Sequence, residues 1–217
     1  MEKYDAVGLV FPVYYIHAPE IVIRCLENVR FRKSQRVFMI AAYAGSWGYA
    51  LSDVRHELAK NREIDMQEFR ARMPGNHILE YGAFPRFYQD RIIKKAMKQL
   101  EGIASAIIHH KITKPIAPNL LAVWFKRNGD KMIQTFNESG TKLHANENCR
   151  NCGICQKICP VGNIVAANSN IVWGKYCQRC MACIQWCPHN AIRHPDLKES
   201  RKRYTCPGVV YQQLRRE

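Results

Sequence analysis

Eight of the ten cysteines lie in one short segment, and their spacing is the feature that most directly implies chemistry. Residues 149–160 read CRNCGICQKICP and residues 177–188 read CQRCMACIQWCP, so each has the pattern C-x2-C-x2-C-x3-C-P. Three thiolates on such a tight loop can each reach a different iron of one cubane, and the pattern is typical of [4Fe–4S] binding. The stretches are offset by 28 positions, from Cys149 to Cys177, which indicates a tandem repeat.

The fourth cysteine of each repeat precedes a proline, and in two-cluster proteins with this pattern it ligates the cluster of the other repeat. We therefore predict a first cluster on Cys149, Cys152, Cys155 and Cys187, and a second on Cys177, Cys180, Cys183 and Cys159. Small residues, Gly153 in the first repeat and Ala182 in the second, would let the backbone curl so that its N–H groups point at cluster sulfurs.

Two structural zinc sites or a disulfide framework are the alternatives for these cysteines. Zinc modules usually present two separated C-x2-C pairs around one ion, which is not the spacing found here. Residues 6–16 have the length of a signal-peptide core, but Glu2 and Asp5 precede them and no small-x-small cleavage site follows, so they are interpreted as a buried strand. A reducing, cytoplasmic compartment follows, and there clustered cysteines favour metal over disulfides. No apolar run approaches the roughly 18–20 residues that a membrane-spanning helix needs.

The remaining cysteines and the segment between the repeats have simpler interpretations. Cys25 lies in a helical pattern over residues 19–30 and is interpreted as a small core residue, and Cys206 as a loop thiol without a ligand role. Residues 164–173 read IVAANSNIVW, two short apolar runs around Asn168 and Ser169. This pattern predicts a β-hairpin that would cover the clusters and exclude water.

The first half of the chain alternates between strand and helix patterns. Apolar runs predict strands over residues 6–13 and 36–44, and a weaker, alternating pattern predicts a third strand over 64–72. Helical periodicity predicts helices over 19–29, 49–61 and 87–110. Such alternation with apolar strands predicts a parallel sheet that is covered on both faces. Ligands of such sheets bind beyond the carboxyl ends of the strands.

Two loops leave those ends and carry aromatic and small residues. The loop at residues 11–19 contains Tyr14 and Tyr15, and the loop at residues 43–48 contains the small residues Ala44, Gly45 and Ser46 between Tyr43 and Trp47. The small residues would let the backbone approach a flat ring on which the aromatic side chains stack. Aromatic residues near strand ends also cap cores, so the residues alone leave both interpretations open.

Several of these motifs together resemble a known family. FPVY after the first strand, AGSWG after the second, MPGNH at residues 73–77 and VWGKYCQRCMACIQWCP at the second repeat are similar to fusion proteins in which a flavodoxin-like domain precedes a two-cluster bacterial ferredoxin domain. The resemblance covers most of residues 4–112 and 149–204. It implies FMN between the two aromatic-bearing loops, with electrons passing between flavin and clusters.

The sequence departs from this family at its start. Family members begin with a strand and a Ser/Thr–Gly-rich turn that binds the FMN phosphate, and no such segment precedes residues 1–5. FMN binding is therefore expected only if such a turn is present. Without that segment the strand at residues 6–13 would be an apolar strand at the edge of the sheet, which proteins normally avoid. A truncated chain start is the favoured explanation, and a homodimer across the first strand or a degenerate domain are the others.

The expected organisation is therefore two domains. Residues 1–112 are expected to form an N-terminally incomplete, flavodoxin-like α/β domain with a parallel sheet, and residues 113–143 a linker with a short helix at 119–127. Residues 144–217 are expected to form a small α+β, two-[4Fe–4S] ferredoxin-like domain with a basic C-terminal tail.

The charge is strongly positive, with 33 Lys and Arg against 18 Asp and Glu, and residues 149–217 alone carry 11 basic and 3 acidic residues. No nucleic-acid recognition fold or base-stacking platform is evident, so docking of an acidic redox partner is the better interpretation. The leading hypothesis is an electron carrier that relays single electrons through two [4Fe–4S] clusters. A flavin-dependent iron–sulfur oxidoreductase acting on a small substrate is the alternative, and a nucleic-acid-binding protein with structural clusters is the third.

Overall fold

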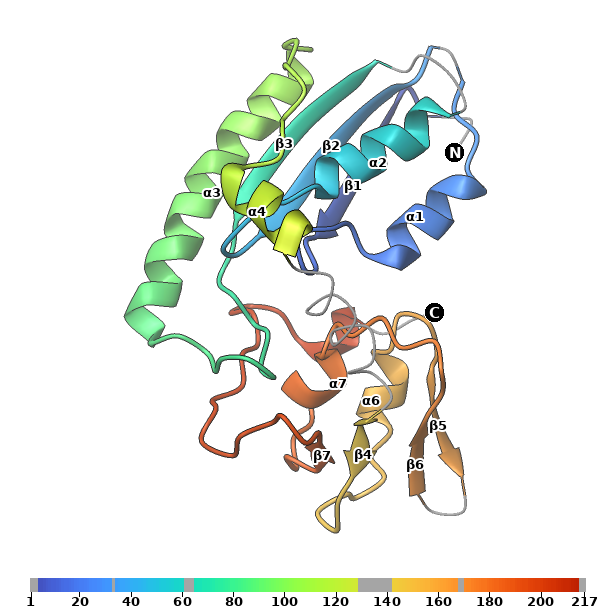
Figure 1. The fold of residues 1–217 in the computed structure, drawn as a ribbon, viewed down its shortest axis with the longest axis vertical. Coiled ribbons are helices and arrows are strands. Elements are labelled where there is room, and N and C mark those ends of the chain that lie inside the picture. Colours follow the sequence, from blue (N-terminus) through green and yellow to red (C-terminus); the bar gives the residue numbers. More distant parts are fainter. Residues whose placement is uncertain (1–3, 33, 61–64, 129–141, 168–169, 215–217) are drawn as a thin grey trace. The chain divides into compact units, whose positions relative to one another are not determined.

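The structure, a computed structural model, describes residues 4–32, 34–60, 65–128, 142–167 and 170–214 (Figure 1). The chain divides into two compact units. The first comprises residues 1–75 and 84–130, and the second comprises residues 76–83 and 131–217. The sequence predicts a first domain that runs unbroken to residue 112, so the assignment of residues 76–83 to the second unit is a difference from that expectation.

The first unit is built on three parallel strands in the order β1-β2-β3, namely β1 (Ala6–Pro12), β2 (Arg36–Tyr43) and β3 (Met66–Arg72). The side chains of β2 alternate between the two faces, as the period of a strand requires. Val37, Met39 and Ala41 are fully buried on one face, while Phe38 and Ile40 pack on the other. The parallel sheet expected from the apolar strands is confirmed.

Helices cover both faces of this sheet (Figure 1). On one face α1 (Glu20–Glu27) and α2 (Ala50–Ala59) pack on β2 through an apolar cluster that includes Leu26 and Leu51. On the other face α3 (Arg86–Ile108) packs on β2 and β3 through Ile103. A further helix, α4 (Leu120–Asn128), follows α3. Among the described residues β1 pairs only with β2, and Val10 at the sheet edge is 68% exposed.

The second unit is a repeat of short elements. Helix α6 (Ile154–Lys157) and helix α7 (Ala182–Gln185) lie 28 residues apart. Strand β4 (His144–Ala145) pairs antiparallel with β7 (Ile192–Arg193), and β5 (Ile164–Ala167) pairs antiparallel with β6 (Asn170–Trp173). A 3₁₀ turn at Tyr211–Gln213 ends the described part of the unit. The β5–β6 pair confirms the hairpin expected at residues 164–173, whose turn at residues 168–169 lies outside the described residues.

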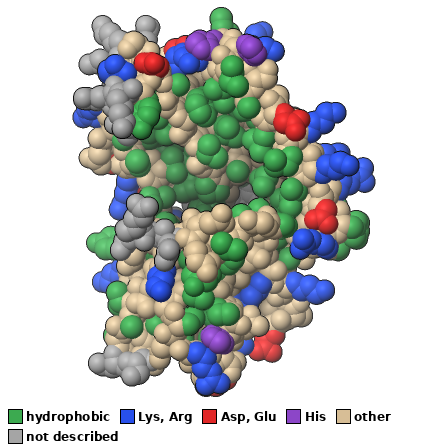
Figure 2. Space-filling view, turned by 180° about the vertical axis from the view of Figure 1, so that it is seen from behind, with side chains coloured by type: hydrophobic (Ala, Val, Ile, Leu, Met, Phe, Trp, Pro, Cys, Tyr) green, Lys and Arg blue, Asp and Glu red, His purple; other side chains and the backbone are tan. Residues whose placement is uncertain are grey.

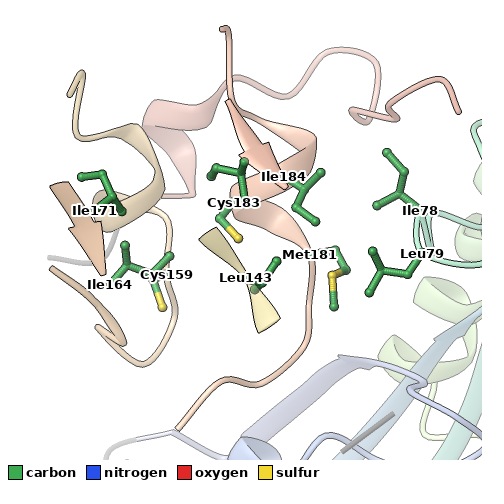
Figure 3. Close-up of a cluster of buried hydrophobic side chains, with 10 residues drawn as sticks. Ile78, Leu79, Leu143, Cys159, Ile164, Ile171, Met181, Cys183 and Ile184 are labelled. Atoms are coloured by element: carbon green, nitrogen blue, oxygen red, sulfur yellow. The ribbon is translucent and has the colours of Figure 1, made fainter. Parts of the chain in front are cut away.

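Residues 76–83 belong to the second unit because they complete its core. Ile78 is 1% exposed and, with Leu79, packs in one apolar cluster with Met181 and Ile184 (Figure 3). Hydrogen bonds hold the segment at both ends: the side-chain amide of Gln185 donates to the Asn76 carbonyl at 2.7 Å, and the Ala83 N–H donates to the Lys202 carbonyl at 2.7 Å. The second unit therefore takes part of its core from a connection between β3 and α3.

Candidate metal centre

The second unit contains two hollows, each lined by four of the eight clustered cysteines. The hollows measure about 370 and 350 Å³, counting their open mouths. The first is lined by Cys149, Cys152, Cys155 and Cys187, and the second by Cys159, Cys177, Cys180 and Cys183. The fold thus brings together the two sets that the spacing predicts, including the exchange of the fourth cysteine between repeats.

The backbone turns in the same way around both hollows. Positive φ angles recur at three pairs of positions that are 28 residues apart: Asn151 and Arg179 (50° and 55°), Gly153 and Met181 (72° and 57°), and Gly162 and Asn190 (60° and 50°). The counterpart of Gly153 is therefore Met181. The sequence prediction of Ala182 for this role, which is based on its small side chain, is wrong. A left-handed conformation costs a residue with a side chain about 1–2 kcal/mol. Met181 is 3% exposed in the core, and its burial offsets this cost.

Backbone N–H groups reach the sulfurs at equivalent places in the two repeats. The Asn163 N–H donates to the Cys159 sulfur at 3.2 Å, and the Ala191 N–H donates to the Cys187 sulfur at 3.3 Å. Each donor lies four residues after its cysteine and beyond the end of the short helix. Donors of this kind stabilise negative charge on a thiolate or on a cluster that the thiolate holds.

The two sets of cysteines differ in burial. In the first set Cys152 is exposed, whereas Cys159 and Cys183 of the second set are buried. Burial raises the pKa of Cys155 and of Cys180 to about 11, and it raises the pKa of Cys183 as well. These thiols hold their protons at neutral pH, so a metal that binds the sulfurs has to displace those protons.

The donor set fits a group larger than a single ion. Within the described residues, no three His, Cys, Asp or Glu side chains are close enough together to hold one metal ion. Four thiolates around one zinc would each lie about 2.3 Å from it. Four cysteines spread around a hollow, with N–H donors aimed at the sulfurs, instead suit a cubane in which each thiolate binds its own iron.

Trp173, at the end of β6, is the side chain that both hollows share. It lines the first and the second hollow, and Ile171 on the same strand lines the first. Its indole N–H is buried without a hydrogen-bond partner among the described residues. Burial raises the pKa of Cys183, and the Trp173 side chain opposes a small part of that rise. The hairpin therefore covers both hollows, as the sequence predicts.

Asn163 anchors that hairpin, a role that sequence reasoning missed. Its side-chain amide donates to the Gly174 carbonyl at 2.9 Å and accepts from the Tyr176 N–H at 2.9 Å, which joins the two ends of the hairpin. A Cβ at Gly174 would lie 2.6 Å from the Asn163 side-chain oxygen, so a larger residue here would displace the side chain that joins the ends of the hairpin. The repeat gives no signal for this role, because the position equivalent to Asn163 is Ala191.

The residues predicted to surround a flavin ring lie in the first unit, on two loops that touch at the carboxyl edge of the sheet. The Tyr49 N–H donates to the Ile16 carbonyl at 2.5 Å, which places the loop bearing Tyr14 and Tyr15 beside the loop bearing Trp47. Tyr43 contacts Trp47 edge-on, with ring centroids 5.5 Å apart. The structure therefore brings the two predicted loops together.

Several groups of the second loop already have partners within the first unit. The Arg70 guanidinium lies 3.6 Å from the ring centre of Trp47, whose indole N–H donates to a backbone carbonyl at residue 117. Ser46 contacts Asn119 at 3.0 Å, and Arg72 donates to the Ala44 carbonyl at 3.1 Å. A Cβ at Gly45 would meet open space. A ring stacked on Trp47 would have to use the face opposite Arg70 or displace that side chain.

A histidine–aspartate contact that sequence reasoning missed holds the first of these loops. His17 Nδ1 lies 2.9 Å from an Asp53 oxygen that also accepts the Ala18 N–H at 3.1 Å. The His17 ring stacks on Tyr49 with centroids 5.7 Å apart. These contacts fix the first loop on the start of α2.

The two cysteines outside the repeats have different surroundings from each other. Cys25 is exposed, so its interpretation as a core residue is wrong. The buried residue of α1 is the adjacent Leu26, and a side chain one position away on a helix points about 100° around the axis. Cys206 is half-buried in a loop and lines neither hollow.

No described helix has the length and apolar character that would be needed to cross a membrane. Over 51 residues the chain is 35% identical to the polyferredoxin protein MvhB of Methanothermus fervidus, and the match covers 24% of this chain and 12% of that relative. No protein-family model and no solved structure matches the chain. These findings support a ferredoxin-like, iron–sulfur region, while the flavodoxin-like character of the first unit stays a prediction.

Proposed function

We propose that this chain is an electron-transfer protein whose second unit holds two [4Fe–4S] clusters. The observation that carries the proposal is the division of eight cysteines into two hollows with four sulfurs each. The similarity to part of a polyferredoxin supports it. The first hollow would hold its cluster on Cys149, Cys152, Cys155 and Cys187, and the second on Cys159, Cys177, Cys180 and Cys183.

The clusters supply one-electron transfer, and the chain supplies ligands, hydrogen bonds and shelter from water. Thiolates bind the irons, and the N–H groups of Asn163 and Ala191 stabilise charge at Cys159 and Cys187. Trp173 and the hairpin exclude solvent from the two sites. Trp173 lines both hollows, so the two sites share one side chain and are near enough for electrons to pass between them.

An acidic redox protein is the proposed partner. Cys152 is exposed, and Arg150 beside it is exposed and also lines the first hollow. Lys and Arg side chains far outnumber Asp and Glu on the face shown in Figure 2. Positive surface charge steers an acidic partner and accelerates its association, an effect that weakens as salt is added.

A flavin-dependent iron–sulfur oxidoreductase is the second candidate. The observation that favours it is the contact between the two aromatic-bearing loops at the carboxyl edge of a parallel sheet, where such folds bind ligands. In this version the first unit is flavodoxin-like and binds FMN near Trp47. Purified protein that retains about one FMN per chain would favour this candidate over a simple carrier.

Iron and sulfide analysis of protein prepared without oxygen tests the proposed function. Two cubanes require about eight irons and eight sulfides per chain, with visible absorption that bleaches on reduction and returns on oxidation. Bound zinc, or fewer than about eight irons after reconstitution, would contradict it. Clusters that cannot be cycled, together with salt-sensitive binding to nucleic acid, would favour a structural role instead.

A further inference from the structure

The first hollow is bordered by exposed residues from both repeats. The described residues that line it and are exposed are Arg150, Asn151, Cys152, Pro188 and His189, and we call these five residues the rim. Among the described residues that line the second hollow, Pro160 alone is exposed. The first hollow therefore presents more of its lining to solvent.

The repeat allows the two hollows to be compared position by position. Positive φ angles recur at equivalent residues, so the backbone follows the same path around both. In three pairs of residues that are 28 positions apart, the member at the first hollow is exposed and its counterpart at the second is not: Arg150 and Gln178, Cys152 and Cys180, and His189 and Val161. The difference therefore comes from what packs on each loop.

The connection between β3 and α3 packs on the second loop. Met181 of that loop is 3% exposed and lies in one apolar cluster with Ile78 and Leu79 (Figure 3). Its counterpart in the first loop is Gly153, where a Cβ would meet nothing closer than the Gln156 side-chain oxygen at 3.6 Å. The second loop is thus covered at the point where the equivalent point of the first loop is open.

The charges at the two hollows also differ. Arg150 is the only Lys, Arg, Asp or Glu among the described residues that line the first hollow, and the described lining of the second hollow contains none. The exposed Glu147, three positions before Arg150, lines neither hollow. An acidic surface that approaches the rim would therefore meet a cation without an opposing acid in the lining, and such complementarity speeds association.

We propose that the rim is the docking surface for an acidic one-electron redox protein, and that electrons enter and leave the chain through the cluster of the first hollow. This proposal rests on the proposed function, because it assumes a cluster in each hollow. One electron passes between the partner and the first cluster, and no bond is made or broken. The second cluster exchanges its electron through the first, because its cover keeps a partner at a distance at which direct transfer is slow.

Oxidation of the reduced, cluster-loaded full chain by two small complexes of opposite charge tests the docking surface. Stopped-flow absorbance gives the rate with an anion, the cobalt(III) complex of EDTA, and with a cation, hexaamminecobalt(III). Each complex takes one electron from a cluster and becomes cobalt(II). In Arg150→Glu the ratio of the anion's rate to the cation's rate should fall by about fivefold or more at low salt, the size expected when one attraction between unit charges near contact in water is lost. The ratio cancels any change in cluster potential, because both oxidants meet the same cluster.

Lys175→Glu is the matched control. Lys175 is exposed, lies two positions before Cys177 of the second set and lines neither hollow, and the substitution changes the net charge by the same amount. It should change the ratio by less than about twofold. An unchanged ratio in Arg150→Glu, or an equally large change in Lys175→Glu, would overturn the docking surface while leaving the proposed function intact.

Spin relaxation of the two reduced clusters tests which one is within reach of solvent. The probe is tris(oxalato)chromate, an anionic paramagnetic complex that relaxes the clusters it can approach, and Cys152→Ser assigns the signals by perturbing one ligand of the first cluster. The complex should relax the first cluster clearly more than the second in the unaltered chain. Equal relaxation, or stronger relaxation of the second cluster, would overturn the proposal, and fewer than two reducible clusters would overturn the proposed function as well.

Met181→Gly tests the cover with the same probe. Glycine suits the φ of 57° at this position, so the substitution keeps the backbone of the loop and removes the side chain that packs with Ile78 and Leu79. The second cluster should then be relaxed nearly as strongly as the first. No gain in its relaxation would overturn the role of the cover. The comparison in the unaltered chain decides the proposal if this variant does not load its clusters.

Discussion

Ile78→Ala tests whether residues 76–83 are structurally part of the cluster-binding unit. Ile78 is 1% exposed and packs with Met181 and Ile184 of the second unit. The substitution removes three carbon groups, which at about 0.8 kcal/mol each corresponds to about 2.4 kcal/mol of lost transfer free energy. The cavity left behind adds to this, and buried Ile→Ala changes cost about 2–5 kcal/mol in total. We expect a loss of about 3–4 kcal/mol.

The assay is unfolding of the loaded, full-length protein in urea without oxygen, with loss of cluster absorbance reporting on the second unit. Helical circular dichroism, which comes largely from the longer helices of the first unit, is recorded in parallel. Ile112→Ala is the matched control, because Ile112 is 99% exposed and the same change there should be nearly neutral. The cluster signal of Ile78→Ala should disappear at clearly lower urea than in the control. If the two variants lose their clusters at the same urea concentration, residues 76–83 do not support this unit.

Three other perturbations give specific expectations. Gly174→Ala should lower the thermal midpoint of cluster loss, because the new Cβ would lie 2.6 Å from the buried Asn163 amide oxygen. Gly45→Ala is the control and should leave that midpoint unchanged, because a Cβ there meets open space. Equal midpoints for the two variants would contradict the geometry. Trp173→Phe removes an N–H but keeps a ring, so redox titration should show a more negative midpoint for the second cluster, and no shift would count against that donor. Burial and the Arg201 cation lower the pKa of His77 in the folded protein. Below about pH 6.5 the unfolded chain therefore binds a proton at this histidine before the folded protein does. The free energy of unfolding should accordingly decline as the pH falls below that value. Urea unfolding at pH 5.5 and 7.5 should show this decline in the unaltered protein and a smaller one in His77→Gln, and an equal decline in both would exclude His77 as its source.

Local patterns in the sequence predict much of the candidate site. Cysteine spacing determines which sulfurs can share a cluster, because a C-x2-C-x2-C loop is too short to serve two distant sites. The hairpin follows from two short apolar runs around a turn signal. The first two strands follow from apolar runs of suitable length, and the third follows from a weaker alternating pattern. In each case the necessary information lies within a few neighbouring residues.

Features that depend on distant parts of the chain could not be predicted in this way. Ile78 and Leu79 look like ordinary apolar residues near the end of the third strand, and only the fold shows that they pack with the second repeat. Met181 has an unfavourable backbone conformation that residue size did not indicate, because burial in the core compensates for it.

The central claim, two neighbouring [4Fe–4S] clusters, is tested most directly by the paramagnetic resonance spectrum of the fully reduced chain. Trp173 lines both hollows, so the two reduced clusters would be near enough for their spins to interact. We predict a signal that integrates to about two spins per chain and is broadened or split by this interaction, and that simplifies in partly reduced samples. A single, unsplit signal of about one spin per chain, or no signal from protein that contains zinc, would contradict the account.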